Sequence, residues 1–239
     1  MILFISDLHL QAAEPETAQA FLEFLAGPAR QARELWILGD LFELWTADDD
    51  LREAFPASIA DALADLCRSG VAIRIVVGNR DFMLGKVFEA RSGARIVPEP
   101  ALLEFEGKRL VLLHGDAQCT DDVAYQRYRR RIRSPFIQAL QRNLPYFVRR
   151  AIVRRIRQRS VMNRQKYGER KISDLNADAI AEVFRATGAD IMIHGHTHQP
   201  ACHTLAVDER ECQRWVLADW HGKATWLEAG PEGLIARGG

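Results

Sequence analysis

The sequence predicts an α/β domain, and three observations support that prediction. Short runs rich in Ile, Leu and Val alternate along the chain with segments of helical periodicity. Five of these runs are each followed at once by a short polar motif, as where strands of α/β folds end at a binding site. The chain has 239 residues, of which 48% are hydrophobic, so it can form one domain with an inserted subdomain.

The five apolar runs are the expected strands. They are short and lack clean alternation of polar and apolar residues, which is typical of strands buried on both faces. Because the ligand-bearing loops of such folds lie at the carboxyl ends of the strands, we expect a functional site there. The runs cover residues 2–6, 35–38, 73–77, 110–113 and 191–193.

Three segments between these runs have the apolar spacing of helices. In each, apolar side chains recur at three- and four-residue steps, as on the buried face of a helix. Pro15 suits the first turn of the first helix, and Gly70 ends the second. The expected helices cover residues 15–25, 57–67 and 175–186.

The C-terminal part of the chain is patterned differently. It contains four short strand-like runs separated by turn residues such as Gly230-Pro231. We expect these runs to form an antiparallel meander at the edge of one sheet. They cover residues 202–204, 215–218, 224–227 and 234–236.

The chain carries no recognisable secretion signal or membrane span. Residues 1–7 are apolar but lack a basic segment and a cleavage site, so we interpret them as a strand. No run approaches the roughly 18 apolar residues of a spanning helix. The four cysteines are scattered and form no CxxC pair, so we expect reduced thiols in a cytoplasmic protein.

The segment from 123 to 171 interrupts the alternation of strands and helices. Residues 127–171 hold 16 of the 32 Lys and Arg residues of the chain and a single acidic residue. Apolar residues recur among them at helical spacing, and Pro135 and Pro145 suit the first turns of two helices. We therefore interpret 123–171 as an inserted basic helical cap. The expected core comprises residues 1–122 and 172–239.

Three uses of the cap fit its composition. The formal net charge of the whole chain is zero, so only this segment suggests an anionic partner. Contact with anionic lipid headgroups, contact with a phosphate-bearing substrate and a merely solvated basic face all stay open. Nucleic acid fits less well, because aromatic residues of the kind that stack on bases are sparse in the cap.

Five motifs offer oxygen and imidazole ligands at the ends of the expected strands. Two divalent cations about 3.5–4 Å apart need several such ligands from different strands, with one carboxylate shared by both ions. Asp, His and Asn suit manganese, zinc or iron. The motifs are Ile5-Ser6-Asp7-Leu8-His9, Gly39-Asp40, Gly78-Asn79-Arg80-Asp81, His114-Gly115-Asp116 and His194-Gly195-His196-Thr197-His198.

The positions within the motifs suggest which residues are ligands. Side chains two residues apart in an extended segment point the same way, so Asp7 and His9 can face one ion. Asp40 follows a glycine at the end of a strand and is our choice for the shared carboxylate. The remaining candidate ligands are Asn79, His114, His194 and His196.

Other residues of the motifs suit supporting roles. Arg80 is a planar bidentate donor that fits a phosphate oxygen. Asp81 and Asp116 are expected to orient imidazoles or Arg80. His198 can be a ligand, a proton donor or a hydrogen-bonded loop residue, and we favour the last of these roles.

Taken together, the motifs resemble those of the calcineurin-like metallophosphoesterases. The general pattern of that family is D-x-H, G-D, G-N-H-[DE], H and G-H-x-H, and this chain departs from it at Arg80, where most members carry His. Arginine there resembles one group of the family, the UDP-2,3-diacylglucosamine diphosphatases of lipid A biosynthesis. The likeness extends over essentially the whole chain and is most specific in GNRDF at 78–82 and CTDD at 119–122.

The resemblance implies a fold and a metal centre. The fold would be a four-layer α/β/β/α sandwich with an inserted helical cap. The centre would hold two Mn²⁺ ions. Its ligands would be Asp7, His9, Asp40, Asn79, His114, His194 and His196.

The resemblance also implies a reaction. Metal-activated water would attack the α-phosphate of UDP-2,3-diacylglucosamine and give UMP and 2,3-diacylglucosamine 1-phosphate. The catalytic residues would be Asp40, Asn79, Arg80 and His114. The substrate contacts would be Asn79, Arg80, Asp122, Ser160, Lys166 and His194, with Asn163 or Arg164 in an intermediate position.

Partners and location follow from the same resemblance. The apolar face of the cap would receive acyl chains, and its arginines would hold the protein on the anionic cytoplasmic face of the bacterial inner membrane. We expect a monomer without a nucleic-acid partner. Two alternatives stay open. One is a metal-dependent nuclease or phosphodiesterase of the same superfamily, and the other is a non-catalytic scaffold, which the intact ligand positions argue against.

Overall fold

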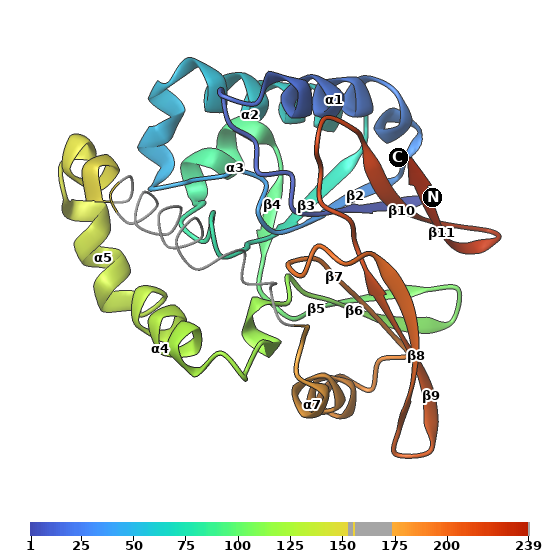
Figure 1. Cartoon of the computed structure of the whole chain (residues 1–239). Coiled ribbons are helices and arrows are strands. Elements are labelled where there is room, and N and C mark those ends of the chain that lie inside the picture. Colours follow the sequence, from blue (N-terminus) through green and yellow to red (C-terminus); the bar gives the residue numbers. More distant parts are fainter. Residues whose placement is uncertain (153–154, 156–173, 239) are drawn as a thin grey trace.

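A computed structural model describes residues 1–152, 155 and 174–238, and it consists of two β-sheets packed face to face with helices on both outer faces (Figure 1). The order of layers is therefore helix, sheet, sheet, helix. This arrangement confirms the α/β fold class and the four-layer sandwich expected from the sequence. It places the ends of the central strands of both sheets at a common edge.

The first sheet has six strands in the order β11-β10-β1-β2-β3-β4. Strands β1 to β4 run parallel to one another, and β10 pairs antiparallel with β1. The N-terminal strand is therefore central in the sheet and buried throughout. The strands are β1 Ile2–Ile5, β2 Glu34–Leu38, β3 Ala72–Val76, β4 Arg95–Val97, β10 Thr225–Gly230 and β11 Gly233–Gly238.

The second sheet has five strands in the order β5-β6-β7-β9-β8. The inner strands β6, β7 and β9 are parallel, and the outer strands β5 and β8 pair with them in antiparallel fashion. The strands are β5 Ala101–Phe105, β6 Lys108–Leu112, β7 Ile191–His194, β8 Ala201–Val207 and β9 Arg210–Val216.

The prediction for the C-terminal runs was wrong in one respect. They do not form one meander at one edge, because the hairpin β8-β9 joins the second sheet and the hairpin β10-β11 joins the first. Each hairpin is antiparallel, as its turn residues indicate, but pairing with β7 or β1 depends on residues far away in the sequence. Local pattern therefore predicted the hairpins and not the sheets that they join.

Helices cover the outer faces of the two sheets (Figure 1). Pro15 occupies the first turn of α1, and Gly70 follows α2 with a positive φ of 99°, as expected from the sequence. Asn176 caps α7 by accepting hydrogen bonds from two backbone N–H groups of its first turn. The helices are α1 Pro15–Ala26, α2 Ala54–Arg68 and α3 Lys86–Ser92 on the first sheet and α7 Ala177–Thr187 on the second.

Alternation along the strands divides the core into layers. Ile2 and Phe4 on β1 pack between the two sheets, whereas Leu3 and Ile5 pack against the helices. On the other side of the molecule, Phe184 of α7 packs onto the outer face of the second sheet and is fully buried. The central strands are thus covered on both faces, which explains why they have no polar alternation, whereas the outer strands β5 and β8 of the second sheet alternate with exposed residues.

The cap segment stands to one side of the two sheets and is helical where it is described (Figure 1). It contains α4 Val123–Ile132, α5 Pro135–Asn143 and a further helical stretch from 146 to 152. Pro135 is the first helical residue of α5, as predicted. The expected end of the cap at 171 lies outside the described residues.

Two further expectations concern helix length and thiols. Among the described residues, no helix has the length and apolar character needed to cross a bilayer. The four cysteines are all free in the structure, and the reduced state of their thiols stays a prediction.

The layer under α7 allows a test of packing. Replacing Phe184 by Ala should lower the free energy of unfolding by about 3–5 kcal/mol, because a fully buried ring leaves a cavity. Leu102→Ala, at a position that is 53% exposed on β5, should change it by no more than about 0.5 kcal/mol. Urea unfolding of the two variants measures both values, and equal losses would contradict this account of the core.

Candidate metal centre

The predicted ligands lie at the carboxyl ends of five parallel strands. Three of these strands belong to the first sheet and two to the second, so the site spans the junction of the two sheets. Two contacts join the sheets there, because the backbone N–H of His196 donates to Asp7 Oδ2 at 2.8 Å and His114 Nδ1 lies 2.9 Å from the carbonyl oxygen of Leu38. The strands and their residues are β1 with Asp7 and His9, β2 with Asp40, β3 with Asn79, β6 with His114, and β7 with His194 and His196.

The backbone is unusual at five residues of this site. Each is a non-glycine residue with a positive φ, a conformation that L-residues rarely adopt. The tightly connected strand ends must hold these residues there, and such strain is typical of functional sites. The residues and φ values are Asp7 (53°), His9 (51°), Asp40 (54°), His196 (69°) and His198 (55°).

Two groups of side chains could each hold a cation. In one group, ligand atoms of Asp7, His9 and His198 lie within 4.8 Å of one another, and in the other those of Asp7, Asp40 and His114 do so. Asp7 belongs to both groups. The structure therefore brings carboxylates and imidazoles from β1, β2, β6 and the loop after β7 into one cluster.

Asp40 belongs to the second group and also approaches the first. Its Oδ2 is 3.7 Å from His114 Nε2 and 3.9 Å from His9 Nδ1, so it is close to one imidazole of each group. The prediction that Asp40 is the carboxylate shared by two ions stays a prediction. Asp7 is an equally placed carboxylate that the sequence did not single out for that role.

Hydrogen bonds orient the imidazoles of His114 and His194. A backbone carbonyl holds the Nδ1 of each ring, from Leu38 at 2.9 Å and from Gly195 at 2.8 Å. Such a bond fixes a proton on Nδ1 and leaves Nε2 as the nitrogen that can face a cation. His114 Nε2 then lies 3.0 Å from the amide oxygen of Asn79.

The environment of the Nε2 atom of His194 shows whether these residues fit a metal. The atom is fully buried and has no hydrogen-bond partner among the described residues. Buried polar atoms are nearly always paired, so this orphaned imidazole nitrogen is an atom that a cation would satisfy, although His194 belongs to neither of the two groups described above. The donor set of imidazole, carboxylate and amide oxygen also fits a divalent transition metal.

The charges of the site favour a cation. Burial lowers the pKa of His194 to about 3 and that of His196 to about 4, so both rings are neutral ligands at neutral pH. Burial also opposes the charged form of His114 and His198, yet nearby carboxylates raise their pKa values to about 9 and about 10. The cluster therefore attracts positive charge strongly enough to protonate buried imidazoles.

Arg80 reaches the edge of this cluster. Its Nη1 donates to Glu43 Oε2 at 2.6 Å, and its Nε lies 3.4 Å from Asp40 Oδ2. Glu43 also lies 3.3 Å from Nδ1 of His9, so one carboxylate contacts both the candidate ligand and the arginine. The side chain of Arg80 is 23% exposed, which leaves its guanidinium accessible to an anion beside the cluster.

Asp81 and Asp116 do not orient the groups that we expected. Asp81 accepts hydrogen bonds from the backbone N–H groups of Leu41 and Gly78 and so connects the loops after β2 and β3. Asp116 is bound by side chains of α4. These two carboxylates are fully buried and hold loops and the cap in place, rather than an imidazole or Arg80.

The expected substrate contacts are only partly described. Asp122 is exposed and accepts a hydrogen bond from the backbone N–H of Tyr125, so it caps the first turn of α4 at the junction of core and cap. The structure records no bond between Asp122 and the metal cluster within the described residues. The other expected contacts, Ser160, Asn163, Arg164 and Lys166, lie outside the described residues.

Sequence reasoning underestimated His198. Its Nε2 lies 3.3 Å from Asp7 Oδ1, and its Nδ1 lies 2.9 Å from Asp219, so it is part of the cluster and not only a loop residue. The spacing of two residues between His194, His196 and His198 was the available signal. Asp219 follows β9 without any motif, and only the fold brings it to His198.

Two glycines are required because the carboxylates lie against the backbone. A side chain at Gly195 would collide with Asp7 and Ser6, and one at Gly78 would collide with the carboxylate and backbone of Asp40. The motif glycines therefore leave space for the ligands of the neighbouring strand.

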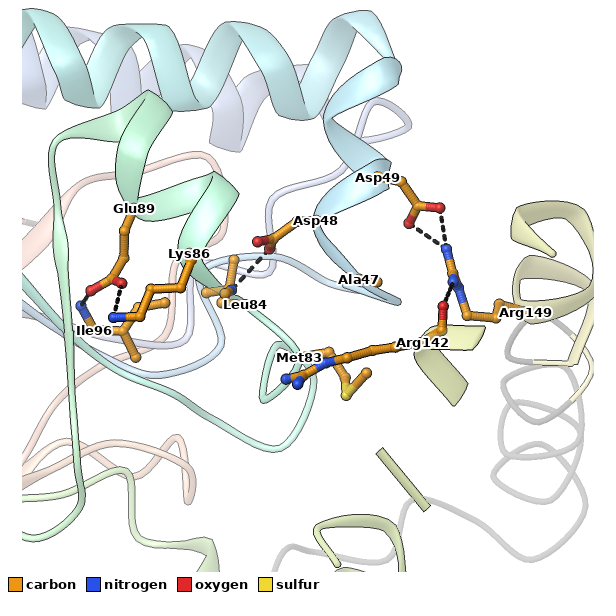
Figure 2. A pocket seen from close by; sticks show the side chains of 11 residues that line it. Ala47, Asp48, Asp49, Met83, Leu84, Lys86, Glu89, Ile96, Arg142 and Arg149 are labelled. Carbon is orange, nitrogen blue, oxygen red and sulfur yellow. Dashed lines mark hydrogen bonds and ion pairs between the residues drawn. The ribbon is translucent and has the colours of Figure 1, made fainter. Parts of the chain in front are cut away.

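A cavity of about 620 Å³ lies between the core and the cap (Figure 2). Ala47, Met83, Leu84 and Ile96 form apolar parts of its lining. Figure 2 shows Arg142 extending toward Met83 from the cap side. The pair of Arg149 and Asp49 bridges the cap and the core at the rim.

Comparison with known proteins gives one consistent result. Residues 1–200 match the sequence profile of the family described as Calcineurin-like phosphoesterase. The chain is 45% identical over 232 residues to a protein of Aromatoleum aromaticum named UDP-2,3-diacylglucosamine hydrolase, covering 96% of this chain and 94% of that protein. Proteins of the same name from Proteus mirabilis and Pseudomonas fluorescens Pf-5 are 44% and 42% identical, covering 95% and 98% of this chain and 93% of each relative.

The glycine beside Asp7 allows a test of the centre. Gly195→Ala should displace the Asp7 carboxylate and weaken binding of Mn²⁺ or Zn²⁺ by at least about ten-fold, the range found when the support of a ligand is lost. Gly107→Ala is the control, because a Cβ at Gly107 meets nothing within 4 Å. Its φ of 75° makes it the more strained backbone substitution of the two, so a smaller loss of metal affinity there cannot come from a milder backbone change. Isothermal titration calorimetry with each metal measures the effect, and equal affinities in the two variants would contradict the site.

Proposed function

The chain belongs to the calcineurin-like phosphoesterase family, and on that premise we propose that it hydrolyses the pyrophosphate bond of UDP-2,3-diacylglucosamine. The products are UMP and 2,3-diacylglucosamine 1-phosphate. Relatives of that name that align with nearly all of this chain support the choice of substrate. The observation that carries the proposal is Arg80, held by Glu43 at 2.6 Å beside Asp40 at the edge of the ligand cluster.

The metal centre would hold two divalent cations, which we propose to be Mn²⁺. The proposed ligands are Asp7, His9, Asp40, Asn79, His114, His194 and His196. Such a pair of ions supplies charge to polarise a phosphoryl group and lowers the pKa of a water molecule. The orphaned Nε2 of His194 and the negative potential around His114 support this assignment.

Arg80 suits a pyrophosphate better than histidine does. Hydrolysis breaks the bond between the α-phosphorus and the oxygen that bridges it to the sugar phosphate, and water supplies the new oxygen. The leaving group is a phosphate, which departs as a stable anion and needs no proton. A guanidinium cannot donate a proton at neutral pH, but its fork of N–H groups offsets charge on phosphate oxygens.

Other side chains position the parts of this reaction. Asn79 and His114 contact each other at 3.0 Å and would flank the phosphoryl group from the side of β3 and β6. Asp40 accepts the backbone N–H of Arg80 at 2.9 Å, which couples the proposed ligand to the phosphate-binding residue. His194 and Asp122 are proposed substrate contacts, as are Ser160, Asn163, Arg164 and Lys166 beyond the described residues.

The cap would serve the lipid part of the substrate. Phe136, Leu140 and Phe147 expose 76%, 52% and 72% of their area, which is unusual for large apolar side chains. Arg142 lies on α5 together with Phe136 and Leu140, and Arg131 lies on the preceding helix α4. This combination supports a protein that rests on an anionic lipid surface and takes acyl chains between cap and core, where the cavity lies. We propose the cytoplasmic face of the inner membrane as that surface and a monomer as the active form.

Turnover of the lipid sugar nucleotide tests the function. With Mn²⁺ present, the protein should release UMP from UDP-2,3-diacylglucosamine, and hydrolysis in H₂¹⁸O should place the label in UMP, because water attacks the α-phosphorus. Single-stranded DNA should stay intact under the same conditions. Cleavage of DNA in place of the nucleotide sugar would favour the nuclease, and label in the sugar phosphate would contradict the point of attack.

Arg80→Ala should lower kcat/KM by about 10²–10³-fold, the cost of losing one preorganised charge contact to the transition state. Arg33→Ala is the matched control, because Arg33 is 69% exposed and precedes β2 at the end remote from the site. Chelation by EDTA should abolish turnover in both proteins, and Mn²⁺ should restore it. Equal kcat/KM values for the Arg80 and Arg33 variants would contradict the proposed role of Arg80.

Membrane contact is tested with the exposed phenylalanines. The double variant Phe136→Ser and Phe147→Ser should bind vesicles of phosphatidylglycerol and phosphatidylethanolamine at least about ten-fold more weakly, because burial of each ring contributes about 1.5–3 kcal/mol. Val87→Ser, which is 60% exposed on α3 of the core, should bind as the parent does. Co-sedimentation of the parent protein with these vesicles should decrease as the salt concentration rises, because salt screens the attraction of the arginines to anionic lipid. Binding of the parent that is independent of salt, or no binding at all, would contradict the role of the arginines.

A further inference from the structure

One face of α4 points into the core rather than to solvent. Tyr125, Arg129 and Arg133 are spaced by four residues and therefore lie in a row along the helix. Each has polar contacts with the loops that carry the proposed ligands. Other arginines of the same helix, Arg127 and Arg130, are exposed, and no such contact is recorded for them among the described residues.

The row converges on Asp116. This carboxylate is fully buried, and it accepts hydrogen bonds from Tyr125 Oη at 2.8 Å and from Arg129 Nε at 2.6 Å, with Arg133 Nη2 at 3.5 Å. A buried charge is tolerated only where it is paired. Asp116 follows His114 by two residues, so the pairing fixes the loop of a proposed metal ligand onto the cap.

Arg133 reaches a second ligand loop. Its Nη2 donates to the carbonyl oxygen of Gly78 at 2.7 Å, and its guanidinium lies 5.7 Å from the centre of the Phe82 ring. Gly78 and Phe82 are the two ends of the GNRDF motif. Arg133 therefore contacts both ends of the segment that carries Asn79 and Arg80.

The remaining contacts of α4 also involve ligands. Arg129 Nη2 lies 3.4 Å from Glu99, whose other oxygen accepts the backbone N–H of His114 at 2.9 Å. The ring of Tyr125 stacks on that of His196 at 6.3 Å between centroids. Helix α4 thus contacts three ligand-bearing loops, those after β3, β6 and β7.

The other attachment of the cap is different in kind. Arg149 pairs with Asp49, and Arg150 pairs with Glu53, at the start of α2 and away from the ligand clusters. Neither Asp49 nor Glu53 belongs to a candidate ligand group, whereas the partners of α4 lie in the ligand loops themselves.

We propose that α4 is part of the support of the metal centre and that Arg133 is a positioning residue, which sets the Asn79–Arg80 segment for metal and phosphate binding. The cap would then couple lipid binding to metal affinity, since any movement of α4 moves that segment. The inference rests on the proposed function only in assuming that the ligand cluster binds divalent cations.

Metal affinity is the direct readout. Arg133→Gln should raise the dissociation constant for Mn²⁺ by about 10–100-fold, the usual range for loss of a group that supports a ligand. Arg130→Gln removes the same charge from an exposed position of the same helix and should change it by less than about two-fold. Electron paramagnetic resonance of free Mn²⁺ in titrations of the whole protein measures both, and Arg133→Lys should recover part of the affinity through the bond to Gly78.

Activity at different Mn²⁺ concentrations distinguishes positioning from general damage. Activity of Arg133→Gln should fall strongly at limiting Mn²⁺ and recover substantially at saturating Mn²⁺, and thermal unfolding of the metal-free variants should occur within a few degrees of the parent. Mn²⁺ affinity equal to that of Arg130→Gln would overturn the inference. A parent protein that binds Mn²⁺ but does not hydrolyse the lipid nucleotide would contradict the proposed function. The Mn²⁺ titrations of the Arg133 and Arg130 variants would still test the role of α4 in that case.

Discussion

The structure depends on the burial of carboxylates where two sheets meet. Asp7 is fully buried, and its Oδ2 is satisfied by Ser6 and by the backbone of His196 from the opposite sheet. Removing a charged group from water is costly unless other groups compensate for the lost solvation. Burial alone would raise the pKa of Asp7, yet its histidine neighbours keep that pKa well below the usual range.

This constraint accounts for other features of the site. Asp7, Asp40 and their histidine neighbours adopt strained backbone conformations because the strand ends must turn sharply to direct them inward. Glycines stand wherever a neighbouring strand approaches a carboxylate. The same negative potential raises the pKa of His114 and His198, which is a measure of how strongly the site attracts a cation. Arg80, the residue that distinguishes this chain from the general family pattern, lies at the edge of this centre.

The cap supplies much of that edge. In its described part, α4 is bonded to the loops of the candidate ligands, and Arg149 and Arg150 form ion pairs with Asp49 and Glu53 just before α2. Between these two sets of contacts lie the cavity and the exposed phenylalanines. A substrate with a charged nucleotide half and a lipid half requires both a polar centre and an apolar surface, and the core supplies the first and the cap the second.

The sequence by itself predicted the strands that carry the candidate ligands, most helices and the candidate ligands themselves. It missed the short strands β4 and β5 and the helix α3. Apolar runs that end in Asp, Asn or His are local patterns in the sequence. Proline in the first turn of a helix is another local pattern, and it correctly marked the starts of α1 at Pro15 and of α5 at Pro135. The sequence could not determine that β8-β9 and β10-β11 join different sheets, because strand pairing depends on distant residues. It also did not reveal that Asp219 holds His198, or that Arg133 reaches Gly78. Those contacts join segments far apart in the chain, and only the packing of the two sheets and the cap brings their atoms within bonding distance.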